Sequence, residues 1–317
     1  MDAVAQLRSA TAAFAKEHLP AADRWCVALS GGPDSLALAA AAAAVLPTTA
    51  LIVDHGLQPG SADVAATAHA QALSLGCVQA QVMTVQVGMK GGPEAAARSA
   101  RYAALDTARA GAPVLIGHTL DDQAETVLLG LGRGSGPRSI AGIRPYDPPW
   151  GRPLLGVRHG VTEAACAELR LNPWRDPHNH DPRFTRARLR AEVLPLLEDV
   201  LGGGVAEALA RTATALQEDG TVLDGLTKHA LTAVRVGAGL DAKALRGIPA
   251  AIRLRVIRAW LLGGGAAGLT GQQIRAVDAL VTTWHGQGGV AVSSGLRRER
   301  LFAGRRDGVL TLHRKPV

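Results

Sequence analysis

Residues 24–46, which read RWCVALSGGPDSLALAAAAAAVL, decide the fold of this chain. Trp25 to Leu29 is a short apolar run that predicts a buried strand, and Leu36 to Leu46 has the composition of a helix. The turn between them carries two glycines, which let the backbone approach an anion closely, and the N-terminus of the next helix offers free N–H groups. We therefore expect a phosphate-binding turn made of Ser30, Gly31, Gly32, Pro33, Asp34 and Ser35. It is not a Walker A loop, because no Gly-Lys-Ser/Thr follows.

The alternation of strand and helix continues along the first half of the chain. Short apolar runs at Ala50–Val53, Val78–Val87 and Pro113–Ile116 predict further strands. Segments of helical composition follow these strands, at 61–75, 94–109 and 123–131. This spacing predicts βαβ units, and therefore a parallel sheet with helices on both faces. Ligands bind at the carboxyl ends of such strands, and three polar clusters fall there, at 30–35, 54–55 and 118–125.

The sequence changes character after residue 150. Residues 183–197 predict a cationic helix and 205–234 a long helix, and 240–285 predicts two or three more. From Val290 to His313 the pattern turns to short alternating strands with glycine turns. With the glycine triplet at 202–204 as a hinge, we expect a catalytic domain at 1–201. The remaining residues, 202–317, would then form a smaller, basic, mainly helical domain. It would begin with a long linker helix and end in short strands.

Charge is distributed unevenly over the 317 residues, whose formal net charge is +7. Residues 1–150 hold 10 basic and 12 acidic side chains, whereas residues 151–317 hold 24 and 15. A basic half of this kind is typical of a surface that binds a polyanion such as nucleic acid, and the C-terminal domain is therefore the expected nucleic-acid-binding part. Only 5 of the 34 cations are lysine, a bias that a GC-rich genome would also produce.

Composition excludes several classes of protein. With 47% hydrophobic and 19% charged residues, the chain is not of the disordered class. The longest apolar run, Leu36 to Leu46, is too short to span a bilayer, and the N-terminus has no signal-peptide pattern. The cysteines, Cys26, Cys77 and Cys166, lie far apart and form no CxxC pair. We therefore expect a cytoplasmic protein that contacts no membrane and holds no cysteine-bound metal.

Six motifs, in the same order, resemble those of one family. SGGPDS resembles the pyrophosphate-binding motif of the N-type ATP pyrophosphatases, the PP-loop superfamily, whose members cleave ATP to AMP and pyrophosphate. Five further stretches resemble motifs of the tRNA(Ile)-lysidine synthetases within that superfamily. They are HGL at 55–57, EAAARSARY at 94–102, HTLDDQAET at 118–126, RGSG at 133–136 and RPLL at 152–155. The resemblance covers residues 24–200 densely.

The resemblance implies an α/β fold of the adenine nucleotide alpha hydrolase-like type and a ligase that forms a carbon–nitrogen bond. The implied reaction joins lysine to C2 of the wobble cytidine of tRNA(Ile) with a CAU anticodon. It passes through an adenylated tRNA and releases AMP and pyrophosphate. ATP and Mg²⁺ are the implied cofactors, and tRNA(Ile) and free L-lysine are the implied partners. The sequence leaves the oligomeric state open, a homodimer included.

The resemblance and the chemistry of the side chains together assign roles to individual residues. Residues 30–35 would bind ATP, and the Asp34 carboxylate beside a phosphate cradle suits a bridging Mg²⁺. The catalytic candidates are Asp34, His55, Arg98, His118, Asp121 and Asp122. Asp121, Asp122 and Glu125 would orient lysine or a metal ion. The candidates for tRNA contacts are Arg101, Arg133, Arg138, Arg183, Arg186, Arg190 and Arg297.

Several candidates also have an ordinary structural explanation. Glu94 and Arg98 have the i,i+4 spacing of a simple helical ion pair, and Asp121 suits the dipole of a helix N-terminus. His55 would suit a hydrogen-bonded strand end, and the arginines of 183–190 a solvated helix. The chain also departs from the family pattern at His178 and Ala187, where the family has a hydroxyl residue and an asparagine.

Three other functions compete with lysidine synthesis. The isolated cysteines argue against the thiolase branch of the superfamily, which uses paired cysteines. Another adenylating tRNA-modifying enzyme, or a small-amide synthetase on the same sheet, would be favoured if lysine did not stimulate pyrophosphate exchange. A basic RNA-binding module with a vestigial nucleotide site would be favoured by failure to bind ATP.

Overall fold

The structure is a computed structural model of the chain. It describes residues 2–56, 58, 60–88, 92–134, 136–176, 181–294 and 299–316. The chain divides into two compact units, Met1–Thr214 and Ala215–Val317, whose boundary falls inside the long helix α10 (Val205–Ala233). Each unit has a sheet and a hydrophobic core of its own.

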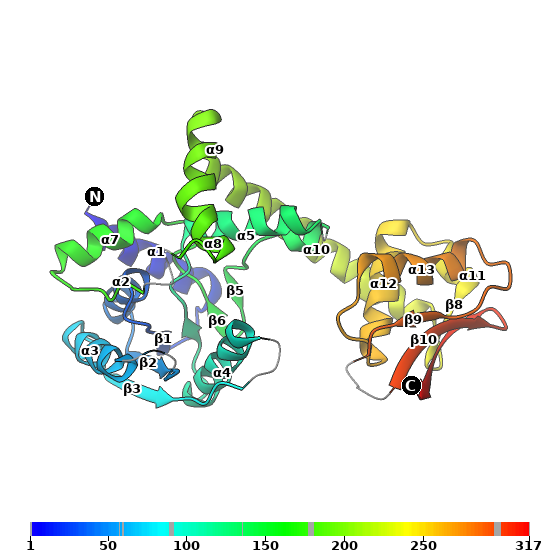
Figure 1. The fold of residues 1–317 in the computed structure, drawn as a ribbon, viewed down its shortest axis with the longest axis horizontal. Coiled ribbons are helices and arrows are strands. Elements are labelled where there is room, and N and C mark those ends of the chain that lie inside the picture. Colours follow the sequence, from blue (N-terminus) through cyan, green and yellow to red (C-terminus); the bar gives the residue numbers. More distant parts are fainter. Residues whose placement is uncertain are drawn as a thin grey trace. The chain divides into compact units, whose positions relative to one another are not determined.

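The first unit is built on a six-stranded sheet in the order β3-β2-β1-β4-β6-β5 (Figure 1). All neighbouring strands pair in parallel except β5, which is antiparallel to β6 at the edge. The strands are β1 (Trp25–Ala28), β2 (Thr48–Asp54), β3 (Gln79–Thr84), β4 (Val114–Leu115), β5 (Tyr146–Asp147) and β6 (Trp150–Gly151). The helices are α1 (Ala3–His18), α2 (Pro33–Ala43), α3 (Ser61–Ser74), α4 (Pro93–Ala108), α5 (Leu120–Arg133), α6 (Pro137–Ile140), α7 (His159–Glu168), α8 (Thr185–Arg188), the π-helical η2 (Leu189–Val193) and α9 (Leu194–Val200).

Alternating side chains of the strands divide this sheet into two buried faces. Val27 and Ile52 pack into one core with α1, α2, α3 and α7, whereas Cys26 and Leu51 pack into another with Leu105 of α4. Burial on both faces is the property of a parallel sheet with helical crossovers. The predicted fold class is confirmed.

Two local features differ from the prediction. The hairpin of β5 and β6 was not expected, because its strands are only two residues long and prolines 148 and 149 separate them. The cationic helix expected at 183–197 runs without a break from Thr185 to Val200 through α8, η2 and α9, with an unpredicted π-helical turn at η2. Gly202, Gly203 and Gly204 all have positive φ, a conformation that ends α9 and that few other residues adopt without strain.

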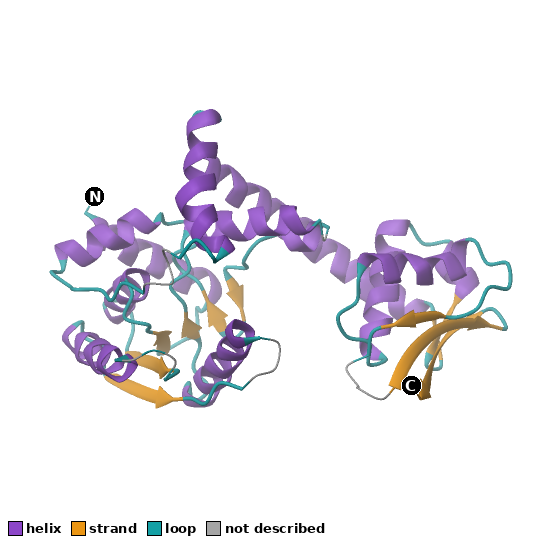
Figure 2. Cartoon of the chain, viewed as in Figure 1, coloured by secondary structure: helices purple, strands orange, loops and turns teal. Residues whose placement is uncertain are grey.

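The second unit packs helices against one side of a five-stranded antiparallel sheet in the order β7-β8-β11-β10-β9 (Figure 2). Its core gathers Trp260 and Ile257 of α12 with Leu301 and Leu310 of the sheet. The helices are α11 (Ala242–Arg246), α12 (Ala250–Gly263) and α13 (Gly271–Thr282). The strands are β7 (Arg235–Val236), β8 (Gly239–Asp241), β9 (Val290–Val292), β10 (Glu299–Arg306) and β11 (Val309–Pro316). The sequence predicted helices followed by strands here, but β10 and β11 are longer, at eight residues each.

Candidate functional site

The turn after β1 presents an open helix N-terminus. Helix α2 begins at Pro33, and within the described chain no side chain caps its first turn. The Ser30 and Ser35 hydroxyls lie 3.1 Å apart, and Ser35 Oγ also donates to the Gly32 carbonyl at 3.0 Å. Gly31 has a φ of +83°, in the left-handed region that glycine adopts without strain. The loop is therefore shaped by its own side chains, and the backbone N–H groups of α2 remain for an anion.

The end of β4 passes directly over this turn. A Cβ atom on Gly117 would lie 3.0 Å from the carbonyl carbon and oxygen of Asp34 and 3.2 Å from the Ser35 nitrogen. Only glycine permits so close an approach without a shift of the backbone. The contact brings the start of α5, with His118 just before it, beside the β1 turn, so two of the predicted polar clusters belong to one site.

Helix α7 holds the Asp34 side chain. Asp34 Oδ1 accepts a hydrogen bond from Nδ1 of His159 at 2.8 Å and another from the Thr162 hydroxyl. The bond to Asp34 raises the pKa of His159, although burial of the ring opposes the shift. Sequence reasoning missed both residues of α7, which lie more than 120 positions from Asp34. A single histidine at the start of a helix gives no recognisable signal.

The carboxylates of α5 are engaged by the protein itself. Asp122 forms a capping box with Thr119, whose N–H donates to Asp122 Oδ2 at 2.8 Å. Asp121 Oδ2 accepts the backbone N–H of His159 at 2.6 Å, and Asp121 Oδ1 lies 3.5 Å from Arg158 Nε. Asp121 therefore connects α5 to the N-terminus of α7.

Glu125 is fully buried and paired with arginines from the segment after α7. Arg190 Nε donates to Glu125 Oε1 at 2.7 Å, and Arg190 Nη2 donates to Asp122 Oδ1 at 3.2 Å. Arg186 Nη1 lies 3.6 Å from Glu125 Oε2. Burial raises the pKa of Glu125, and the positive charge of Arg190 only partly offsets this. Two of the seven arginines predicted for tRNA contacts, Arg186 and Arg190, thus lie against carboxylates of α5.

Four buried polar atoms around these residues have no hydrogen-bond partner within the described part of the chain. They are Nδ1 of His55, Nδ1 of His118, Oε2 of Glu125 and Nε of Arg152. Burial lowers the pKa of His118 to about 4, with Arg152 and Arg98 adding to the shift and Asp122 opposing it. Burial and Arg101 likewise lower the pKa of His55. Both imidazoles are therefore neutral at neutral pH, and the unsatisfied buried atoms are available for hydrogen bonds to water or to a bound ligand.

Helix α4 brings two arginines and a tyrosine to the same edge. The Arg98 and Arg101 guanidinium carbons lie 4.9 and 5.8 Å from the centre of the Tyr102 ring, and Arg98 Nη2 donates to the Tyr102 hydroxyl at 3.3 Å. Burial lowers the pKa of Arg101. The Tyr102 ring packs edge-on against Trp150 of β6 at 4.7 Å. The charges of Arg98 and Arg101 also lower the pKa of His118, and that of Arg101 lowers the pKa of His55, so both guanidinium groups lie near the residues that follow β2 and β4.

The remaining predicted residues lie away from these contacts or outside the described residues. Arg133 at the end of α5 and Arg138 in α6 are both exposed. Arg183 is exposed and pairs with Asp181 at 2.6 Å. Arg297 and His178 lie outside the described residues, and Ala187 lies within α8.

The chemistry at Asp34 fits one divalent cation bound jointly with a phosphate ligand. Within the described ranges no group of three or more His, Cys, Asp or Glu side chains could hold a metal ion alone. Mg²⁺ commonly uses one or two carboxylates and completes its shell with water and substrate phosphates. Asp34 stands at the α2 N-terminus where such phosphates would lie, with Oδ1 fixed by α7.

A search of the described helices for one long and apolar enough to cross a bilayer found none.

Comparison with known proteins agrees with this geometry. Residues 4–197 match the family model of the PP-loop domain, and residues 240–301 match that of the TilS substrate binding domain. The tRNA(Ile)-lysidine synthase of Mycolicibacterium paratuberculosis is 71% identical over 315 residues, which cover 99% of this chain and 98% of that protein. The enzyme of the same name from Mycobacterium tuberculosis is 70% identical over 319 residues, again 99% and 98% of the two chains.

A solved structure with the same fold is the U34-tRNA thiolase NcsA from Methanococcus maripaludis. It superposes with a TM-score of 0.55 at 17% identity, over 68% of this chain and 80% of that one. This likeness shows the fold alone. The near-complete match to lysidine synthases and the two family models show more: the chain belongs to the tRNA(Ile)-lysidine synthase family.

Proposed function

We propose that this protein joins lysine to C2 of the wobble cytidine of tRNA(Ile) with a CAU anticodon, at the expense of ATP. The observation that carries the proposal is the SGGPDS turn, an uncapped helix N-terminus that lies beside a cluster of unpartnered buried polar atoms. An anion site next to unsatisfied donors and acceptors suits an enzyme that binds a nucleotide and a polar co-substrate together.

The β- and γ-phosphates of ATP would lie on the turn at residues 30–35. The backbone N–H groups of α2, the Ser30 and Ser35 hydroxyls and the helix dipole all favour negative charge there. Asp34 would hold Mg²⁺, which when bound offsets charge on the pyrophosphate leaving group. His159 and Thr162 would keep the Asp34 carboxylate turned toward the phosphates.

The reaction needs two displacements. The O2 atom of the cytidine attacks the α-phosphorus of ATP, and pyrophosphate leaves. The ε-amine of lysine then attacks C2, and AMP leaves with the oxygen. Arg98 and Arg101 would supply positive charge that stabilises the phosphates in the first step. Neutral His55 and His118 would offer ring nitrogens to the base or the amine without repelling the lysine ammonium.

The ammonium of lysine becomes a nucleophile only after it loses a proton. Asp121, Asp122 and Glu125 are the carboxylates at hand. Glu125 is the best placed to accept the proton, because its pKa is raised by burial and its Oε2 has no hydrogen-bond partner in the described chain. Asp121 and Asp122 would orient the amine, while Asp121 also joins α5 to α7 and Asp122 caps the N-terminus of α5.

The second unit would contribute most of the electrostatic affinity for tRNA. It carries 15 basic and 7 acidic side chains, against 19 and 20 in the first unit. Phosphate contacts dominate the affinity of such surfaces for RNA. The match of residues 240–301 to a substrate binding domain supports this assignment.

The decisive experiment incubates the protein with ATP, labelled lysine and a tRNA(Ile) transcript. We expect label in the tRNA and none with Asp34→Ala, whereas Asp63→Ala, which removes an exposed carboxylate in the first turn of α3, should leave the labelling unchanged. A folded wild-type chain that binds ATP and tRNA and yet transfers no lysine would overturn the proposal. A rate of pyrophosphate exchange that does not depend on lysine would indicate that a different amine or nucleophile is the substrate.

A further inference from the structure

The sheet of the second unit has one face covered by helices and one face turned away from them (Figure 2). Leu301, Ala303 and Leu310 point toward α12 and α13 and are buried. The alternate positions of β10 and β11 point the other way, since successive residues of a strand face opposite sides. Their cross-strand pairs are Arg300 with Lys315, Phe302 with His313, Gly304 with Thr311 and Arg306 with Val309. We call these eight residues the outer face.

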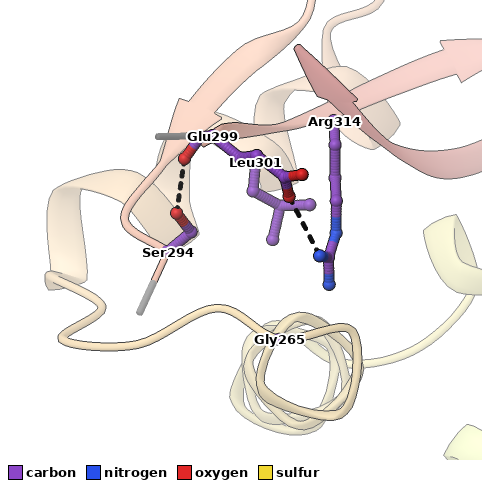
Figure 3. Close-up of a pocket in the computed structure, with 5 residues that line it drawn as sticks. All are labelled: Gly265, Ser294, Glu299, Leu301 and Arg314. Carbon is purple, nitrogen blue, oxygen red and sulfur yellow. Dashed lines mark hydrogen bonds and ion pairs between the residues drawn. The ribbon is translucent and has the colours of Figure 1, made fainter. Parts of the chain in front are cut away.

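The outer face carries cations with little to neutralise them. Among the described residues, no carboxylate lies within ion-pair distance of Arg300 or Lys315, and Arg306 has only Asp307, 4.0 Å away at the exposed turn. The helix side of the same strands is different. There Arg314 Nη1 donates to Glu299 at 3.0 Å, beside Gly265 (Figure 3). On the helix side Arg314 is thus paired with a carboxylate and Arg305 donates to the Leu280 carbonyl at 3.1 Å, whereas Arg300 and Lys315 on the outer face are available to an anionic partner.

An aromatic pair lies at the centre of the outer face. The rings of Phe302 and His313 are stacked, with centroids 5.6 Å apart and planes inclined by 14°. The Lys315 ammonium lies 5.4 Å from the centre of the Phe302 ring. Glycines 289 and 304 flank the His313 ring, since a Cβ atom on either would lie 3.6 Å from His313 Cε1. Phe302 is half-buried between His313 and Lys315, whereas the His313 ring is exposed and the two glycines beside it carry no side chain that could cover it.

We propose that the outer face binds an unpaired nucleotide of the tRNA, with the base stacked on the Phe302–His313 pair and the adjacent phosphates on Arg300 and Lys315. Any base presents a π-face, and aromatic platforms with flanking cations are the usual means of holding single-stranded RNA. Residues 302–316 lie beyond the matched substrate binding domain, which ends at 301. The inference rests on the proposed function only for the identity of the RNA.

A duplex backbone or an acidic protein would need the cations but not the rings. Variants of Phe302 and His313 therefore distinguish an unpaired nucleotide from these two other partners. Phe302→Leu keeps an apolar side chain and removes the ring, and Phe302→Tyr keeps the ring. His313→Ala removes an exposed ring without touching the core, which guards against a variant that fails to fold.

The test measures affinity of the full-length chain for the tRNA(Ile) transcript, for an unstructured oligouridylate and for a blunt RNA duplex, by fluorescence anisotropy. We expect Phe302→Leu and His313→Ala each to weaken binding of the tRNA and the oligouridylate by roughly tenfold, with Phe302→Tyr near wild type. The duplex should bind all of these proteins equally. The pair Arg300→Ala with Lys315→Ala should lower the slope of log Kd against log salt by about 2.

A matched control removes two cations from the helix layer. Arg246→Ala with Arg275→Ala, on α11 and α13, should leave the oligouridylate affinity within about twofold of wild type. Unchanged affinity of the two aromatic variants for the tRNA and the oligouridylate would overturn the proposal. This holds even if the cation variants bind more weakly, because the outer face would then bind RNA phosphates without stacking a base. Lysine transfer by the wild-type chain, measured separately, tests the proposed function. If lysine is not transferred while oligouridylate binding still depends on the two rings, the result would contradict the proposed function and leave the proposal for the outer face intact.

Discussion

His118 shows how a single residue couples the site to the stability of the first unit. Its ring lies between the end of β4 and α5, with Nδ1 buried and, within the described chain, unpartnered. Burial is the main reason why its pKa falls from 6.5 to about 4. A ring that stays neutral through this range can accept or donate one hydrogen bond to a substrate without adding charge to the pocket.

The same pKa predicts how stability depends on pH. Between about pH 6.5 and pH 4 the unfolded chain takes up a proton on His118 and the folded chain does not. The stability that the neutral ring contributes is therefore complete above pH 6.5 and is lost as the pH falls toward 4, by roughly 3 kcal/mol at most. We expect His118→Asn, which cannot titrate, to lose less unfolding free energy than wild type over this range in urea titrations. Parallel curves for the two proteins would contradict this reasoning.

At the scale of elements, the packing of α5 against α6 depends on one glycine. A Cβ atom on Gly130 would overlap the carbonyl oxygen of Ser139 and lie 2.6 Å from its carbonyl carbon. Backbone atoms cannot move aside as the end of a flexible side chain can. Gly132 lies two positions further along the same helix, and a Cβ atom there would meet nothing within 4 Å.

These two glycines make a matched pair of variants. We expect Gly130→Ala to lower the free energy of unfolding by about 3 kcal/mol through overpacking. Gly132→Ala should be neutral or should stabilise the helix by up to about 1 kcal/mol, since alanine is the better helix former. Urea denaturation followed by circular dichroism distinguishes the outcomes. Equal effects of the two changes would mean that α5 and α6 do not pack as closely as the structure has them.

What the sequence could predict at this scale depended on local pattern. The turn at 30–35 and the helix that opens with Thr119 carry their signal within a few residues, because strand, glycine and cap stand next to one another in the chain. The contact of His159 with Asp34 joins residues 125 positions apart, and Arg190 reaches Glu125 across 65. Nothing local in the sequence indicates such pairs. Arg190 in particular is predicted as a tRNA contact from the cationic residues around it, whereas its buried partner Glu125 leaves no signal near it in the sequence.

At the scale of the whole molecule, the two units differ in net charge. The first unit, with 19 basic and 20 acidic side chains, is nearly neutral, whereas the second has a surplus of 8 positive charges. Every residue that we assign to ATP or lysine lies in the first unit, and the outer face lies in the second. Nucleotide chemistry and most of the electrostatic attraction for RNA would therefore reside in separate bodies.

This division predicts the behaviour of a chain that ends at Thr214. Its sheet, its cores and the residues around Asp34 are all retained, so we expect cooperative unfolding and an ATP affinity within about twofold of the full-length protein. Its affinity for tRNA(Ile) at physiological salt should fall by more than about tenfold, and the salt dependence of binding should weaken, because most of the cations free to release counterions are gone. Isothermal titration with ATP and anisotropy with tRNA over a salt series measure both quantities. Unchanged tRNA affinity of the shortened chain would mean that the cations of the first unit supply most of the electrostatic attraction for tRNA. Arg133, Arg138 and Arg183 would then be the residues to substitute next.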